Sequence, residues 1–134
     1  MKRRVLDTNV LVTLWHSGSG RVDSERAAEA VAHGWLAEHP RDAIVTPVRL
    51  EFLGGTRSRD ELRVAEGFLG LFDLLDGGRV LPEDWHVAER YAKRVPFAPR
   101  PRGAIDCLIL AICVRLNASL YTFDGGISRD RGSV

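Results

Sequence analysis

The sequence predicts an α/β fold in which helices enclose a short, mostly parallel sheet, that is, an α/β/α sandwich. Short apolar segments that suit buried strands alternate with longer segments whose apolar residues recur at helical spacing. This alternation is typical of parallel strands joined by helical crossovers. The chain has 134 residues, of which 45% are hydrophobic, and this length fits a single domain over residues 1–134.

Four strands are expected, because four apolar segments are short and bounded by polar or turn-forming residues. They cover residues 3–6, 43–46, 79–81 and 119–122. A last polar segment, residues 128–134, is expected to fray.

Six helices are expected between these strands, each with apolar residues on one helical face. They cover residues 9–15, about 24–38, 47–54, 60–72, 82–92 and 104–116. The second begins at a cap formed by Asp23 or Ser24. In the third, Thr46 is expected as the N-cap with Pro47 at the first helical position. The last helix is the most apolar and contains Cys107 and Cys113, which we expect to be buried, reduced thiols.

Charge and hydropathy exclude several classes of protein. The net charge is +1, from 19 basic and 18 acidic side chains, so a global basic field cannot be the means of binding nucleic acid. No apolar run approaches the roughly 18 residues of a membrane span. The basic start, Met1 to Arg4, is not followed by the apolar segment of a signal peptide. We therefore expect a cytoplasmic protein with no membrane partner.

Four carboxylates lie at the points where the predicted strands end. Asp7 directly follows the first strand, and Glu51 lies early in the helix after the second. Asp106 is in the first turn of the most apolar helix, and Asp124 follows the last strand. The carboxyl ends of parallel strands form the active crevice of open α/β sheets, so these acids are expected to converge there.

Four anions in one crevice repel one another unless a cation is present. Hard oxygen ligands select Mg²⁺ or Mn²⁺, and such ions can activate a water and stabilise the oxygens of a phosphodiester. Each acid alone also has a simpler interpretation. Asp7 could cap a helix, Asp106 could favour a helix dipole, Glu51 could be solvated, and Asp124 could bond within a turn. The co-occurrence of all four favours a metal site.

Several neighbouring polar residues could support such a site. Thr8 and Asn9 can orient a carboxylate by hydrogen bonding, and Thr122 can do the same beside Asp124. Arg100 and Arg102, in a proline-rich loop before Asp106, could bind phosphates that flank the scissile bond. Ordinary capping and a solvated basic loop are the competing interpretations.

The segment Val5–Leu11 resembles the opening motif of PIN-domain nucleases. The spacing to Glu51, to Ile105-Asp106 and its apolar helix, and to Leu120–Asp124 is also similar to that family. The similarity covers about residues 4–127, and the size of the chain resembles the VapC toxins of bacterial VapBC toxin–antitoxin modules.

This resemblance implies a Mg²⁺-dependent endoribonuclease, commonly a homodimer, that a VapB-like antitoxin inhibits. Asp7, Glu51, Asp106 and Asp124 match the acidic positions of the motif, with Asp7 and Asp106 as the surest metal ligands. Many relatives have a further acid and an aromatic residue after the last motif acid. Here Gly125 and Gly126 follow Asp124, so Asp124 is expected to act through a water or through another ligand.

Other functions were weighed against a nuclease toxin. The main alternative is a PIN-domain nuclease outside toxin–antitoxin systems, acting in RNA processing or on DNA. A non-catalytic PIN-like module that binds RNA or a protein would be expected to lack one of the acids. A phosphatase of the haloacid-dehalogenase type usually has a second acid two residues after the first, and position 9 is Asn. A receiver domain usually has a phosphoacceptor Asp after the third strand, where this sequence has Leu81-Pro82.

Overall fold

The computed structural model describes residues 2–17, 25–94 and 103–123. These residues contain a four-stranded sheet in the order β3-β2-β1-β4, and all neighbouring strands are parallel. The strands are β1 (Arg4–Leu6), β2 (Asp42–Ile44), β3 (Asp73–Leu74) and β4 (Ser119–Tyr121). The predicted α/β fold with a short parallel sheet is therefore confirmed.

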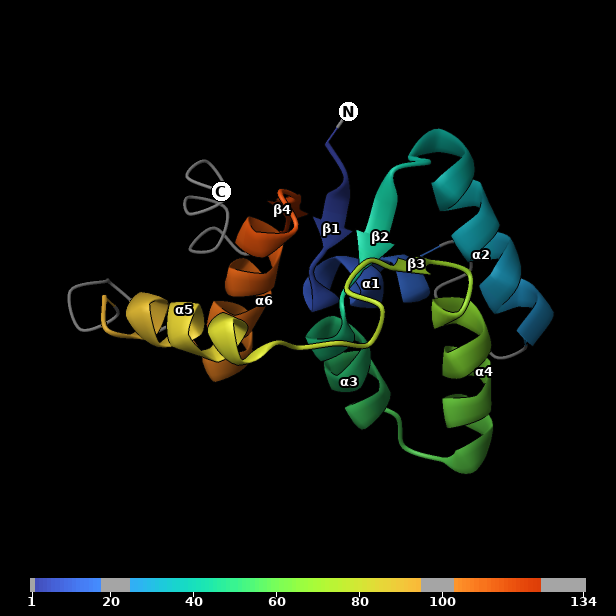
Figure 1. The fold of residues 1–134 in the computed structure, drawn as a ribbon. Helices are drawn as coiled ribbons and strands as arrows, with labels where there is room; N and C mark the ends of the chain where they lie inside the picture. Colours follow the sequence, from blue (N-terminus) through green and yellow to red (C-terminus); the bar gives the residue numbers. More distant parts are fainter. Residues whose placement is uncertain (1, 18–24, 95–102, 124–134) are drawn as a thin grey trace.

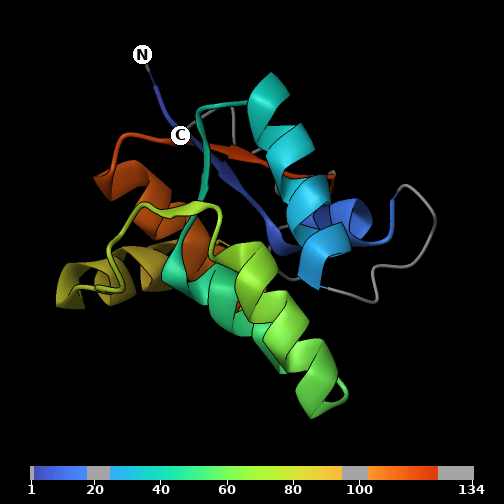
Figure 2. The same ribbon diagram turned by 90° about the vertical axis from the view of Figure 1, so that its right-hand side faces the viewer.

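Helices lie on both sides of this sheet (Figures 1 and 2). The helices are α1 (Thr8–Trp15), α2 (Glu25–Glu38), α3 (Thr46–Gly54), α4 (Arg59–Leu69), α5 (Pro82–Ala92) and α6 (Ala104–Arg115). α2 packs on α4 beyond the β2–β3 side, and α5 packs on α6 beyond the β4 side. α1 and α3 pack together where β1 and β2 end.

β1 lies between β2 and β4 in the sheet. Val5 lies opposite Ala43 of β2 and Leu120 of β4, and its side chain is completely buried. The backbone N–H of Asp7 donates to the carbonyl of Tyr121 at 2.9 Å, so the pairing with β4 continues one residue beyond β1. The residue that follows β1 is therefore fixed in the middle of the carboxyl edge.

The core is built around α6, the helix that the sequence marked as most apolar. Every residue from Cys107 to Cys113 is buried. Both cysteines are free and buried, as predicted. Burial raises the pKa of the Cys113 thiol to about 12, and the negative charge of Asp7 adds to this effect. No described helix is long and apolar enough to cross a membrane.

An aromatic cluster connects α1, α3 and α4. The rings of Trp15 and Phe52 both pack on the fully buried Phe68, with centroids 5.2 and 5.7 Å from it. Edge and stacked contacts of this kind add to the free energy gained by burial. The cluster fixes α1 relative to α3, and these two helices carry Thr8 and Glu51.

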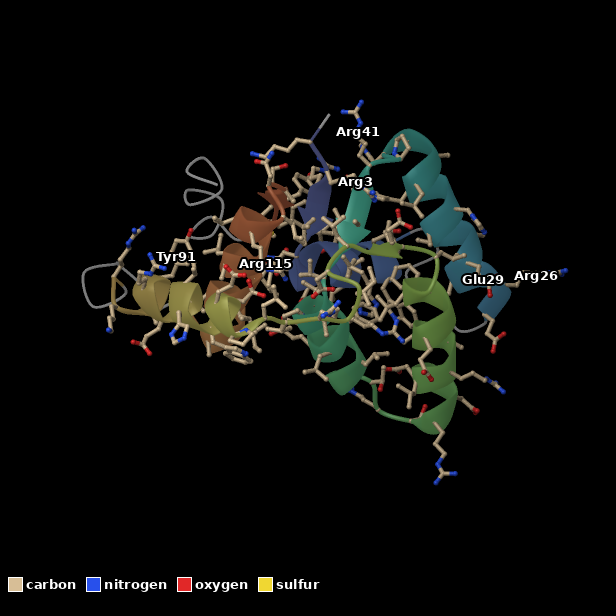
Figure 3. The ribbon with its side chains drawn as sticks, viewed as in Figure 1. Arg3, Arg26, Glu29, Arg41, Tyr91 and Arg115 are labelled. Atoms are coloured by element: carbon tan, nitrogen blue, oxygen red, sulfur yellow. The ribbon has the colours of Figure 1, made fainter. Side chains whose placement is uncertain are left out.

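A buried ion pair connects α5 to α6. Asp84, in the first turn of α5, accepts hydrogen bonds from Nε and Nη2 of Arg115 at 2.8 and 3.0 Å. Arg115 lies where the two helices meet (Figure 3). The hydrogen bond with Asp84 raises the pKa of the Arg115 guanidinium. Asp84 also accepts from the backbone N–H of Leu81 at 2.8 Å, so one carboxylate both caps α5 and holds α6.

The third predicted strand was misplaced. Residues 79–81 form no strand, and β3 is Asp73–Leu74. The predicted helix 60–72 ends earlier, at Leu69, with Gly70 as its C-cap, which frees Asp73 to pair with β2. After β3, Gly77 and Gly78 adopt positive φ values of 62° and 80°, which are open to glycine. The chain therefore turns there and leads directly into α5.

One further expectation needs correction. Thr46 does not cap α3: Val45 is the N-cap and makes no side-chain cap bond. Asp76 supplies the missing acceptor, because its carboxylate accepts from the backbone N–H and the hydroxyl of Thr46 at 2.9 and 2.8 Å.

Candidate functional site

Asp7 is a buried and firmly held acid at the carboxyl edge of the sheet. It follows β1, is the N-cap of α1, and is 4% exposed. Its Oδ1 accepts from the backbone N–H of Thr8 at 2.8 Å, and its Oδ2 accepts from the hydroxyl of Thr122 at 2.8 Å. One oxygen is thus oriented by the helix that begins there, and the other by the segment after β4.

Asn9 determines the direction of the hydrogen bond that Thr122 makes. The backbone N–H of Phe123 donates to Oδ1 of Asn9 at 3.2 Å, which leaves Nδ2 of Asn9 to donate to the Thr122 hydroxyl at 3.0 Å. A hydroxyl has one proton, so Thr122 donates it to Asp7. The result is a directed chain from Asn9 through Thr122 to the carboxylate.

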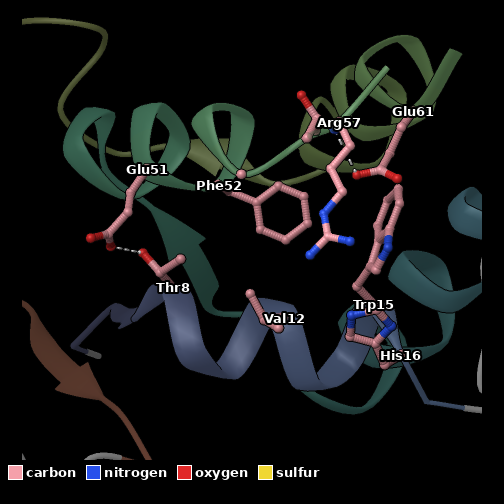
Figure 4. Close-up of a pocket in the computed structure, with 10 residues that line it drawn as sticks. Thr8, Val12, Trp15, His16, Glu51, Phe52, Arg57 and Glu61 are labelled. Atoms are coloured by element: carbon pink, nitrogen blue, oxygen red, sulfur yellow. Dashed lines mark hydrogen bonds between the residues drawn. The ribbon is translucent and has the colours of Figure 1, made fainter. Parts of the chain in front are cut away.

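Glu51 lies on α3 and faces α1. The hydroxyl of Thr8 donates to its Oε1 at 2.5 Å. Figure 4 shows this bond bridging the start of α1 and the middle of α3. Thr8 therefore orients one acid through its side chain and a second, Asp7, through its backbone.

Asp106 lies in the first turn of α6. Together with Asp7 and Glu51 it lines one open depression of about 450 Å³, and Thr8, Asn9 and Thr13 contribute the other polar atoms. Three of the four predicted acids thus border the same depression. Asp124, Arg100 and Arg102 lie outside the described residues.

The donor chemistry of the depression fits a divalent cation. Its polar side chains offer only carboxylate, hydroxyl and amide groups, whose oxygens are the ligands that Mg²⁺ and Mn²⁺ prefer. Within the described residues no three His, Cys, Asp or Glu side chains form a ready-made metal cluster. Asp7, Glu51 and Asp106 therefore border a common space without closing on a single point.

The sequence did not indicate two features of this region. Thr122 was expected to orient Asp124, which lies outside the described residues; the structure shows that its hydroxyl donates to Asp7. A second depression, which His16 and Arg57 help to line, adjoins the first. No local signal marks them, because the packing of α1 on α3 brings them together.

A parallel sheet with carboxylates around its carboxyl edge defines an α/β protein suited to bind a cation there. The sequence model of one family, the PIN domain, matches residues 4–131. The chain therefore belongs to the PIN-domain family. PIN domains are generally metal-dependent nucleases, that is, hydrolases of phosphodiester bonds. A comparison with curated proteins gave no significant match.

Proposed function

We propose that this chain is a Mg²⁺- or Mn²⁺-dependent endoribonuclease that acts as the toxin of a type II toxin–antitoxin system. The observation that carries the proposal is the depression bordered by Asp7, Glu51 and Asp106 in a chain of the PIN-domain family. The motif Val5–Leu11 resembles that of PIN-domain nucleases, and the resemblance of the chain's size and single domain to VapC toxins favours RNA and a toxin role.

Asp7 and Asp106 would hold the cation, and Glu51 and Asp124 would complete the acidic edge. When bound, the cation would help to activate a water and stabilise the oxygens of the phosphodiester. The chain itself supplies orientation. The hydroxyl of Thr122 holds Oδ2 of Asp7, and the hydroxyl of Thr8 holds Glu51. Preset carboxylates need little rearrangement when substrate arrives.

Partners follow from the same proposal. An acidic depression attracts a cationic side chain, so a VapB-like antitoxin would place Arg or Lys there from an apolar helix. Arg100 and Arg102 would contact phosphates of the RNA. A homodimer would cover exposed apolar side chains on the helices, of which Leu50 and Trp85 are 66% and 59% exposed.

The test of activity uses RNA and DNA oligonucleotides with Mg²⁺, Mn²⁺ or EDTA. We expect RNA cleavage that EDTA stops and that both Asp7→Asn and Asp106→Asn reduce at least a hundredfold. Asp73→Asn is the matched control, because Asp73 is exposed on β3 and does not line the depression. Cleavage that persists in EDTA, or in Asp7→Asn, would contradict the proposed mechanism.

A second measurement detects the cation without relying on activity. A ligand that binds only the folded state stabilises it by RT ln(1 + [L]/Kd), about 2.7 kcal/mol at a hundredfold excess over Kd. Mn²⁺ should therefore raise the melting temperature of wild type and of Asp73→Asn, but much less that of Asp106→Asn. An equal rise in all three would place the cation elsewhere.

Expression in a bacterial host separates the toxin from a PIN nuclease with another role. Growth should stop when the chain is produced alone and recover when the product of an adjacent small gene is produced with it. Harmless expression of a chain that still cleaves nucleic acid would favour RNA processing or DNA cleavage instead.

A further inference from the structure

A second depression extends the acidic one along α1. Its volume is about 340 Å³, and it lies between α1, α3 and the connection to α4. Thr8, Val12 and Glu51 line both depressions. The two are therefore neighbouring parts of one continuous surface (Figure 4).

The far end of this second depression is lined by Arg57, His16 and Glu61. Figure 4 shows the guanidinium of Arg57 reaching into it, with the imidazole of His16 facing from α1. Within the described part of the chain, neither group has an ion-pair or hydrogen-bond partner. The carboxylate of Glu61 accepts from the backbone N–H of Arg57 at 3.2 Å, which helps to hold the loop that carries the guanidinium.

The wall beneath Arg57 and His16 is apolar. Trp15 and Phe52 are each 8% exposed, and the exposed side chain of Val12 lines this depression as well as the acidic one. The depression thus offers two unpaired donors over an apolar wall. A phosphate with its attached sugar has the matching chemistry, because the guanidinium fork binds phosphate oxygens through two hydrogen bonds.

The distribution of charge in the chain gives a reason for a contact between Arg57 and a phosphate. The net charge of the chain is +1, so no global field attracts a polyanion, and the acids of the first depression repel phosphates. Affinity for nucleic acid must then come from local cations near the acids. α1 rises about 1.5 Å per residue, so His16 lies roughly 12 Å along the helix from Thr8, a separation that a few nucleotides can span.

We propose that Arg57 and His16 form a subsite for a backbone phosphate of the single-stranded substrate, a few nucleotides from the bond that is cut. This inference rests on the proposed nuclease function and assigns the second depression to the substrate. Arg57 binds the phosphate oxygens through its fork, and His16 donates from the opposite wall. Val12 contacts the sugar or base that connects this phosphate to the acidic depression.

The test measures binding of a fluorescently labelled RNA octanucleotide by anisotropy at several salt concentrations. All variants carry Asp7→Asn, which stops cleavage under the proposed function. Arg57→Gln should raise Kd at least fivefold and reduce the slope of log K against log salt by about 0.7, the value for one phosphate contact on a single strand. Arg57→Lys should keep most of the salt slope while losing part of the affinity.

Arg59→Gln is the matched control, because Arg59 is exposed at the start of α4 and does not line the depression. It should change Kd by less than twofold. Arg57 is also exposed, so its replacement should leave the melting temperature unchanged. If Arg57→Gln and Arg59→Gln bind RNA equally well, the subsite is wrong, while RNA cleavage by the wild-type chain keeps the proposed function.

The same titration with single-stranded DNA distinguishes failure of the proposed ribonuclease function from failure of the subsite at Arg57 and His16. A chain that binds and cuts only DNA contradicts the proposed ribonuclease, and the effect of Arg57→Gln on DNA binding then decides the subsite. Failure to bind either nucleic acid overturns both. Weaker binding of an antitoxin by Arg57→Gln, with nucleic-acid binding unchanged, makes the depression a protein-docking surface and overturns the subsite.

Discussion

At the scale of single residues, Thr122 connects the polar groups around the candidate site. It receives a hydrogen bond from Asn9 and donates one to Asp7, and it is 4% exposed. A buried group that both donates and accepts costs free energy when it is removed, because two partners lose their bonds at once. Its hydroxyl therefore matters for stability as well as for the orientation of Asp7.

Replacement of Thr122 by Val should reveal both effects. The methyl that replaces the hydroxyl leaves Oδ2 of Asp7 and Nδ2 of Asn9 without this partner, at a cost of about 1–3 kcal/mol in the free energy of unfolding. Thr122→Ser keeps the hydroxyl and should cost less. Urea unfolding measures the difference, and cleavage by Thr122→Val should show a lower kcat. Equal stability of the two variants would show that the bond to Asp7 contributes little.

The sequence predicted which acids stand at the carboxyl edge, but not how their neighbours hold them. Asp7 follows a predicted strand, Asp106 lies in the first turn of a predicted helix, and Glu51 lies within the helix that follows the second predicted strand; these positions along the chain are enough to place all three. The contact between Thr122 and Asp7 depends on the register of β1 against β4, across 115 residues of sequence. A spacing pattern contains no information on that register, so Thr122 was assigned to its sequence neighbour, Asp124.

At the scale of helices and strands, the pair of Asp84 and Arg115 holds the last turn of α6 against the first turn of α5. Asp84 is 1% exposed and holds both Arg115 and the backbone of Leu81. Since α6 carries Asp106 in its first turn, this ion pair also contributes to the position of one proposed metal ligand.

We expect Asp84→Ala to lower the free energy of unfolding by about 2–4 kcal/mol, because it leaves Arg115 without its carboxylate partner and uncaps α5. Asp73→Ala breaks the exposed pair of Asp73 with Arg3 and should cost less than about 1 kcal/mol. Chemical denaturation of the two variants makes the comparison. Similar losses would mean that burial does not strengthen the pair on α5 and α6.

Helices and strands were predicted well where their residue types gave a strong local signal. α6 was predicted closely because the seven residues from Cys107 to Cys113 are all apolar, and all seven are buried in the structure. β3 was missed because it has only two residues, one of them the exposed Asp73. Its place beside β2 is fixed by pairing, with Ala43 opposite Asp73, and not by local hydrophobicity.

At the scale of the whole molecule, the buried thiol of Cys113 couples stability to alkaline pH. The folded chain keeps the thiol proton to about pH 12, whereas the ordinary pKa of a thiol is 9.0. Between these values the unfolded chain binds fewer protons than the folded chain. The free energy of unfolding therefore falls as pH rises, by up to about 1.4 kcal/mol per pH unit.

This contribution should be fully present below pH 9 and decline above it. Urea unfolding of wild type and of Cys113→Ala at pH 7, 8, 9, 10 and 10.5 isolates it, because other titrating groups are common to both chains. The difference in free energy between the two should be constant below pH 9 and shrink above it. A constant difference over the whole range would show that the thiol loses its proton equally easily in both states.

The central position of β1 has a consequence for the folding of the chain during its synthesis on the ribosome. Chains grow from the amino end at roughly 5–20 residues per second, so Asp7 is made about 6–23 s before Thr122, which lies 115 residues later. During this interval β1 lacks its neighbour β4, and Asp7 lacks the hydroxyl that orients it. The nascent polypeptide therefore carries Asp7 and Glu51 well before β4 exists, whereas Asp106 is made shortly before Thr122, so translation itself delays completion of the carboxyl edge.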